Sequence, residues 1–195
     1  MLARSILRTT TSHSFRPASS ASFIRSFSST PAIMVKVGDP IPDVDLFEDS
    51  PGNKVNLSKE LSSGKGVIIG VPAAFSPSCS DTHIPGYVAS DKLKSAGKVF
   101  VVSVNDPFVM KAWAKSLDES KKSGIRFLAD PAGEFTRAWD VEFDASKLLG
   151  NKRSKRYAVV TEDGKAVKVA VEPDNTGVTV SAADKVLSAI PKAQL

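Results

Sequence analysis

The chain has a single cysteine, Cys79, among its 195 residues. One thiol cannot form a disulfide within the chain, which excludes the disulfide-stapled class of secreted proteins and leaves only disulfides with another molecule. The chain also lacks an apolar run of roughly 20 residues, the length that spans a bilayer, because Gly and Pro interrupt each candidate. We therefore expect a protein of the cell interior with no membrane partner.

Acidic residues are absent from the start of the chain, where the first one is Asp39. Of the net charge of +5, four units come from Arg4, Arg8, Arg16 and Arg25, so the rest of the chain carries a net charge of only +1. A near-neutral body lacks the broad basic surface that neutralises phosphates. Nucleic acid is therefore not an expected partner.

Residues 1–34 have the composition of a mitochondrial transit peptide. The segment is rich in Ser, Thr, Ala and Arg, has no Asp, Glu or Lys, and places Leu2, Ile6 and Leu7 near one helical face. The alternative is a disordered Ser-rich tail. We predict a cleaved extension and a mitochondrial location, in the matrix, with a cytosolic form if translation starts at Met34.

Residues 35–195 predict one α/β domain, because the chain is too short to bury two hydrophobic cores of ordinary size. Apolar runs typical of buried strands alternate with segments of helical periodicity. This order predicts a mixed central β-sheet flanked by helices on both faces, with an N-terminal β-hairpin. The expected strands lie within residues 44–57, 67–71, 98–104, 125–129, 157–160 and 166–171. The expected helices begin near residue 78 and span residues 107–119, 133–139 and 181–190, the last with Ser181 as its N-cap.

Cys79 lies where the predicted strand 67–71 gives way to a helix that begins near Ser78. Backbone N–H groups at a helix N-terminus favour an anion, and a thiol attacks only as its thiolate. Two interpretations stay open at this point. The side chain is either a reactive thiol or a small buried apolar group.

The residues around Cys79 form a known pattern. Pro72, Ser76 and Cys79 match Pro-x-x-x-Thr/Ser-x-x-Cys, the signature of the peroxiredoxins. The likeness to the atypical, type II branch of that family covers residues 35–195 and is carried by residues 70–87, 150–157 and 171–179. The resemblance implies a thioredoxin-like fold and a one-cysteine, mitochondrial form of this branch from a fungus.

Each residue of the signature has a chemical task. A peroxide needs a thiolate aligned with its O–O bond and donors that hold both oxygens. Cys79 is the expected thiolate, Ser76 brings its hydroxyl, and the backbone N–H groups of Ser78 and Cys79 complete a small donor nest. Pro72, which has no N–H, would screen the pocket from water. In the alternative interpretation Pro72 merely shapes a loop and Ser76 caps a local turn.

The resemblance implies that Arg156 is the cation that holds the thiolate and polarises the peroxide, a task for a side chain that never deprotonates. Without the resemblance, Arg156 would be part of an ordinary solvated basic loop. His83, one turn past Cys79, is a candidate base or hydrogen-bond partner for the substrate, and by the resemblance it supports the pocket wall. Animal relatives carry a second cysteine where this chain has Val180, so this chain would need an external thiol.

The implied function is a thiol-specific peroxidase that reduces hydrogen peroxide and alkyl hydroperoxides through a Cys79 sulfenic acid. It would need no cofactor and no metal, and would serve redox homeostasis and oxidative-stress defence. Glutathione with glutaredoxin, or thioredoxin, would regenerate it, and the resemblance also implies a homodimer. Two other functions stay open: a redox sensor or thiol-dependent chaperone, and a glutathione-binding transferase.

Overall fold

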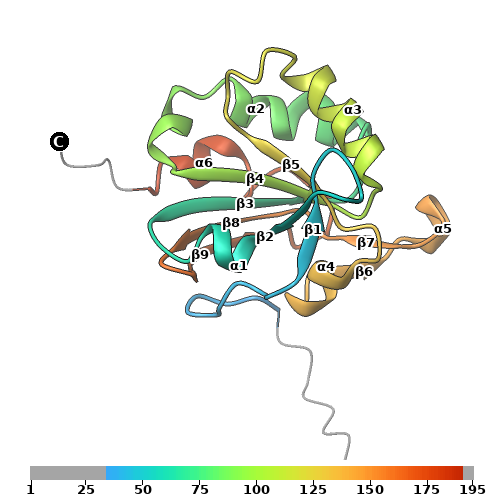
Figure 1. Ribbon diagram of the computed structural model, residues 1–195, viewed down its shortest axis with the longest axis horizontal. Coiled ribbons are helices and arrows are strands. Elements are labelled where there is room, and N and C mark those ends of the chain that lie inside the picture. Colours follow the sequence, from blue (N-terminus) through green and yellow to red (C-terminus); the bar gives the residue numbers. More distant parts are fainter. Residues whose placement is uncertain (1–33, 191–195) are drawn as a thin grey trace, which may run out of the picture. The chain divides into compact units, whose positions relative to one another are not determined.

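The computed structural model describes residues 34–190, so the predicted transit peptide lies outside the described residues apart from Met34. Within that range one sheet has the strand order β2-β1-β5-β4-β3-β8-β9 (Figure 1). Its three central strands, β5, β4 and β3, are parallel, and the other neighbours are antiparallel, which confirms the predicted mixed sheet. The strands are β1 (Asp45–Phe47), β2 (Lys54–Asn56), β3 (Lys65–Val71), β4 (Lys98–Ser103), β5 (Arg126–Ala129), β8 (Tyr157–Glu162) and β9 (Lys165–Val171).

The central strands are apolar at nearly every position because both faces of the sheet are covered. Side chains of a strand alternate between the two faces, so a strand buried on both sides needs an apolar residue at each position. Along β3, Val67 and Ile69 pack into one hydrophobic cluster, whereas Ile68 packs into the other. The predicted helices on both faces are therefore confirmed.

Helices α2, α3 and α6 lie on one side of the sheet in Figure 1, and α1 and α4 lie on the other. Asp106 caps α3 by accepting from the N–H groups of Phe108 and Val109, and Pro107 takes the first helical position, where a missing N–H costs nothing. The helices are α1 (Leu57–Glu60), α2 (Ile84–Val88), α3 (Pro107–Leu117), α4 (Glu134–Ala138) and α6 (Ala183–Leu187).

The structure differs from the sequence prediction at several short elements. Ser181 is not the N-cap of the last helix, because α6 begins at Ala183 and the Ser181 hydroxyl donates to Glu172 instead. The helix that begins at Ser78 starts as a π-helical turn. Elements of three to five residues are too short to show a period, and those missed are α1, the 3₁₀ turn Asp91–Ser95, β6 (Glu142–Asp144), α5 (Ser146–Leu149) and β7 (Lys152–Ser154).

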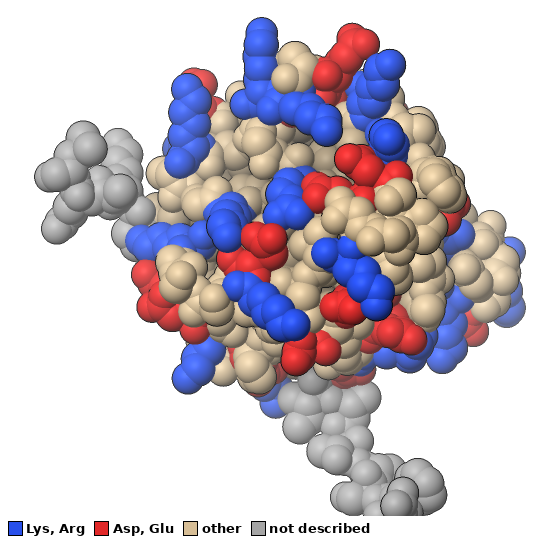
Figure 2. All heavy atoms as spheres, viewed as in Figure 1, with Lys and Arg blue, Asp and Glu red and all other residues tan. Residues whose placement is uncertain are grey.

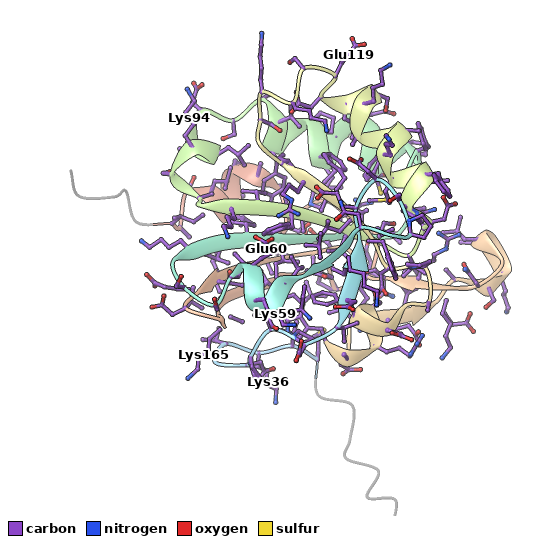
Figure 3. All side chains as sticks on the ribbon, in the orientation of Figure 1. Lys36, Lys59, Glu60, Lys94, Glu119 and Lys165 are labelled. Atoms are coloured by element: carbon purple, nitrogen blue, oxygen red, sulfur yellow. The ribbon has the colours of Figure 1, made fainter. Side chains whose placement is uncertain are left out.

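The surface of the described residues carries charges of both signs. Figure 2 shows basic and acidic side chains interspersed over the visible face. Glu60, labelled in Figure 3, illustrates the pattern, because its carboxylate pairs with both Lys98 and Arg126. In residues 34–190, no helix has the length and apolar character needed to cross a membrane.

Candidate active site

The loop between β3 and the π-helical turn carries the predicted nucleophile. β3 ends at Val71, and Pro72, which has no N–H to continue the ladder, begins the loop. Phe75 lies in the left-handed region with φ of 62°, a conformation that costs on the order of 1–3 kcal/mol for such residues and clusters at functional sites. Cys79 follows in the π-helical turn Ser78–His83, at the predicted strand-to-helix junction, and is fully buried.

Arg156 reaches Cys79 because β3 and β8 are antiparallel neighbours. Gly70 pairs with Tyr157, so Arg156, immediately before β8, lies beside the carboxyl end of β3. Its Nη1 donates to Cys79 Sγ at 3.3 Å, and its Nε donates to the Thr176 carbonyl at 3.0 Å. The sheet register thus brings together two residues that are 77 positions apart in sequence.

The charge of Arg156 is buried without a carboxylate partner. The residue is 2% exposed, and none of the ion pairs among residues 34–190 involves it. Burying a charge is costly unless an opposite charge or well-placed hydrogen bonds compensate. Of the groups that contact this guanidinium, only the Cys79 sulfur can become an anion.

His83 is buried between Arg156 and Ser181. Its Nδ1 lies 3.2 Å from Arg156 Nη1, and its Nε2 lies 3.1 Å from the Ser181 carbonyl. Burial and then the charge of Arg156 lower the pKa of His83 to about 4, so the ring is neutral near pH 7. Because a guanidinium only donates, Nδ1 accepts and Nε2–H donates. Both ring nitrogens are occupied, so His83 contacts the arginine of the site rather than a substrate.

Pro72 and Ser76 occupy the loop before Cys79. Pro72 is buried, consistent with a wall that excludes water. The Ser76 hydroxyl donates to the Ala73 carbonyl at 2.9 Å, as expected of a turn cap, yet its oxygen keeps lone pairs that can accept a hydrogen bond. Ser78 and Cys79 lie in the first helical turn, where backbone N–H groups have no intrahelical acceptor.

Sequence reasoning missed Ser103 and Asn105, which hold the loop from the neighbouring strand. Asn105 Oδ1 accepts from the Ala74 N–H at 3.0 Å and from the Ser103 hydroxyl at 2.7 Å. Their position in the sequence could have indicated them, because they lie at the carboxyl end of a predicted parallel strand. The carboxyl ends of parallel strands meet at one edge of a sheet, and polar residues at that edge often belong to a site. The pair fixes the backbone two residues before Ser76.

Other features of the described residues lie apart from this cluster. A hollow along α3 and β5, with Phe108, Lys115 and Ile125 in its lining, contains none of the predicted site residues. In residues 34–190, no group of three or more His, Cys, Asp or Glu side chains is placed to hold a metal ion.

Comparison with known proteins places this geometry in context. Residues 36–187 match the family described as Redoxin. The chain is 51% identical over 160 residues to peroxisomal membrane associated protein 20 of Schizosaccharomyces pombe, covering 80% of this chain and all of the relative. It is 40% identical to peroxiredoxin-2C of Oryza sativa, covering 80% of this chain and 98% of the relative.

A solved structure supports the same assignment. The crystal structure of peroxiredoxin 5 from Alvinella pompejana is 43% identical, with a TM-score of 0.69, and the alignment covers 80% of this chain and 97% of that one. The thioredoxin-like fold predicted from the sequence is confirmed. The similarity to a peroxiredoxin 5 also supports the predicted type II branch.

One prediction is corrected by these relatives. The mitochondrial location, with its cytosolic form from Met34, is contradicted, because the relative from Schizosaccharomyces pombe is named as peroxisomal. The error has a physical cause. The positive charge of an Arg-rich segment without acidic residues determines how the segment responds to a membrane potential. Composition alone does not identify the receptor that sorts the protein.

Proposed function

This chain belongs to the peroxiredoxins, which are thiol-dependent peroxidases acting on peroxides, and on that premise we propose that Cys79 is the nucleophile of a one-cysteine mechanism. One observation carries the proposal. The buried guanidinium of Arg156 donates to Cys79 Sγ at 3.3 Å and pairs with no carboxylate among the described residues. A thiolate is the counter-charge that this guanidinium otherwise lacks.

The proposed first step is a displacement at oxygen. The Cys79 thiolate attacks one oxygen of hydrogen peroxide or an alkyl hydroperoxide, the O–O bond breaks, and the other oxygen leaves with the bonding electrons and takes up a proton as water or alcohol. Sulfur is oxidised to the sulfenic acid, and the peroxide is reduced. Arg156 stabilises the charge that moves from sulfur to the leaving oxygen.

The remaining site residues position the peroxide in this proposal. Ser76 accepts a hydrogen bond from the peroxide O–H, because its own proton is directed to the Ala73 carbonyl. The backbone N–H groups of Ser78 and Cys79 donate to the oxygens, and Pro72 keeps water out. His83 acts only through Arg156.

We propose that an external thiol completes the cycle, because the chain has no second cysteine. A glutathione thiolate attacks the sulfenic sulfur, the S–O bond breaks, and the leaving hydroxide takes up a proton as water. Glutaredoxin or a second thiol then reduces the mixed disulfide that forms. The complete burial of Cys79 supports a small thiol as the first reductant, since a protein thiol such as that of thioredoxin needs more space. Redox homeostasis and defence against oxidative stress are the proposed roles.

A homodimer is part of the proposal. Phe75 and Phe108 are 54% and 63% exposed, and the hydrogen bond from Ala74 to Asn105 ties their two segments together. Exposed aromatic side chains are typical of an interface between proteins. Sedimentation of the purified chain, compared with its Phe108→Glu variant, measures the assembly.

The proposed function is tested by peroxide consumption. Wild type and Cys79→Ser are each mixed with hydrogen peroxide and either glutathione with glutaredoxin or thioredoxin with its reductase. Wild type should turn over many times with one of these systems, because a peroxidase is regenerated, whereas Cys79→Ser should consume no peroxide. Equal consumption by the two proteins would remove Cys79 from the mechanism. A wild type that reacts only once per thiol with either reductant would indicate a redox sensor instead.

A further inference from the structure

Glu172 is a buried carboxylate that the mechanism above does not use. It begins the segment from Glu172 to Ser181, called here the 172–181 loop, and is 1% exposed. Its Oε1 accepts from the backbone N–H groups of Thr179 and Ser181 at 2.7 and 2.9 Å and from the Ser181 hydroxyl at 2.7 Å. Its Oε2 accepts from the Thr179 hydroxyl at 2.6 Å. These four hydrogen bonds fix the last residues of the loop.

The Ser181 carbonyl faces the site. It accepts from His83 Nε2 at 3.1 Å and from the Tyr87 hydroxyl at 2.7 Å, which uses both of its lone pairs. Burial raises the pKa of Tyr87, so this hydroxyl keeps its proton and donates. The carbonyl therefore holds the Nε2–H tautomer of His83, whose Nδ1 then accepts from Arg156.

The other part of the loop binds Arg156 directly. The Asn175 carbonyl accepts from the Arg156 backbone N–H at 2.7 Å, and the Thr176 carbonyl accepts from its Nε at 3.0 Å. The backbone N–H of Glu172 donates to the Arg156 carbonyl at 2.9 Å. The guanidinium is therefore held by the loop along its stem and by His83 at Nη1.

We infer that Glu172 is a positioning residue for the peroxidase reaction, acting through Ser181 and His83 to aim Nη1 of Arg156 at Cys79 Sγ. One N–H of Nη1 bonds His83, which leaves the second N–H directed to sulfur. Without the carboxylate, the 179–181 backbone loses its acceptors, the Ser181 carbonyl moves, and His83 loses the bond that sets its tautomer. This inference rests on the proposed role of Cys79.

The test compares Glu172→Ala and Glu172→Gln with wild type in the full chain. In Glu172→Gln, the amide oxygen can accept from the backbone N–H groups of Thr179 and Ser181, and the amide N–H can donate to the Thr179 hydroxyl. This variant is the conservative rescue. Asp130→Ala is the matched control, because Asp130 is also a buried carboxylate, and it accepts from the backbone N–H groups of Phe135 and Thr136 rather than from the 172–181 loop.

Two measurements separate positioning from stability. The first is the pH midpoint of Cys79 alkylation by iodoacetamide, which reports the thiolate, and the second is the rate of reaction with hydrogen peroxide. Thermal unfolding is recorded beside them. We expect Glu172→Ala to raise the alkylation midpoint by about one pH unit, since a tenfold change in the thiolate equilibrium corresponds to about one unit. We expect its peroxide rate to fall by about tenfold to 100-fold, as misplacement of a catalytic group does.

The controls decide the interpretation. Glu172→Gln should stay within about threefold of wild type, while Asp130→Ala should lose a comparable amount of thermal stability and keep its alkylation midpoint. An unchanged midpoint and rate in Glu172→Ala would overturn the inference, as would an equal loss in Asp130→Ala. If Glu172→Ala does not fold, a Thr179→Val, Ser181→Ala double variant removes two of the four bonds, and the same shift is expected. A wild type without peroxidase activity would refute the proposed function alone, because the alkylation midpoint does not depend on turnover.

Discussion

Arg156 makes contacts that no other cation reproduces. Its guanidinium donates at once to Cys79, His83 and Thr176. The Lys ammonium is a point charge on a flexible stem and cannot hold this planar arrangement. We expect Arg156→Lys to slow the reaction with hydrogen peroxide by about 100-fold or more, the cost of losing one such donor at a reacting centre. Stopped-flow peroxide reduction measures this rate.

Arg153→Lys is the matched control for that prediction. Arg153 lies three residues earlier and donates to the Asn151 side chain and the Val104 carbonyl, with no contact to Cys79. Its variant should keep nearly the wild-type rate. A similar loss in both variants would indicate a general effect of the basic segment, and no loss in Arg156→Lys would remove the guanidinium from the mechanism.

The two halves of the site differ in how far the sequence reveals them. Pro72, Ser76 and Cys79 lie within eight positions, so local spacing and the family resemblance sufficed to predict them. Arg156 came only from the resemblance, because its contact with Cys79 depends on the register between β3 and β8. Glu172 lies in the segment 171–179 that carries part of the resemblance, but the resemblance assigned it no role. Its role follows from hydrogen bonds across the 172–181 loop. The spacing of residues in a single sequence does not reveal these hydrogen bonds.

Among the elements, the helix after Cys79 shows where sequence patterns lose resolution. Pro85 signals an interruption, since it has no N–H for an α-helical bond. The preceding turn closes instead through the Ile84 N–H and the Cys79 carbonyl, five residues apart, which is π-helical geometry. The apolar spacing of an α-turn and a π-turn is too similar to separate them in six residues. The choice is made by packing, because His83 is tied to Arg156 and Ser181.

The contact between β3 and β8 predicts the effect of a substitution at Gly70. Gly70 pairs with Tyr157, and a Cβ at Gly70 would overlap the Tyr157 ring. We expect Gly70→Ala to destabilise the protein by about 1–3 kcal/mol, as overpacking does. Because Tyr157 directly follows Arg156, peroxidase activity should fall as well. Urea unfolding and the peroxide assay measure the two effects.

Gly52→Ala provides the comparison for that substitution. Gly52 lies in the turn between β1 and β2, has open space where a Cβ would be, and does not adopt a positive φ. Its substitution should change stability by about 0.5 kcal/mol or less. If Gly70→Ala were equally neutral, the β3–β8 interface would be looser than the structure indicates, and the placement of Arg156 would not depend on it.

For the whole molecule, two buried groups make the free energy of unfolding depend on pH in the acidic range. The pKa of His83 is lowered to about 4 from 6.5 by burial and by Arg156, so the unfolded chain binds the proton first as pH falls. Burial alone would raise the pKa of Glu172, but the hydrogen bonds from Thr179 and Ser181 outweigh it and lower that pKa to about 2 from 4.5. Both groups therefore contribute their full stabilisation at neutral pH. The contribution of His83 is lost as the pH falls from 6.5 to 4, and that of Glu172 is lost as it falls from 4.5 to 2.

Urea unfolding at a series of pH values tests this order. The contribution of these two groups to the free energy of unfolding should be constant from pH 8 to 7. The free energy of unfolding should then fall by on the order of 3 kcal/mol between pH 6.5 and 4, because His83 binds a proton more weakly in the folded protein than in the unfolded chain. The chain has two histidines, so His83→Asn isolates this step from His13. In that variant the first decline should be largely absent, while the decline below pH 4.5 that belongs to Glu172 should remain. A wild-type stability that stays level down to pH 5 would mean that His83 is not buried beside Arg156. The same network that aims the arginine at Cys79 would then be broken at its centre.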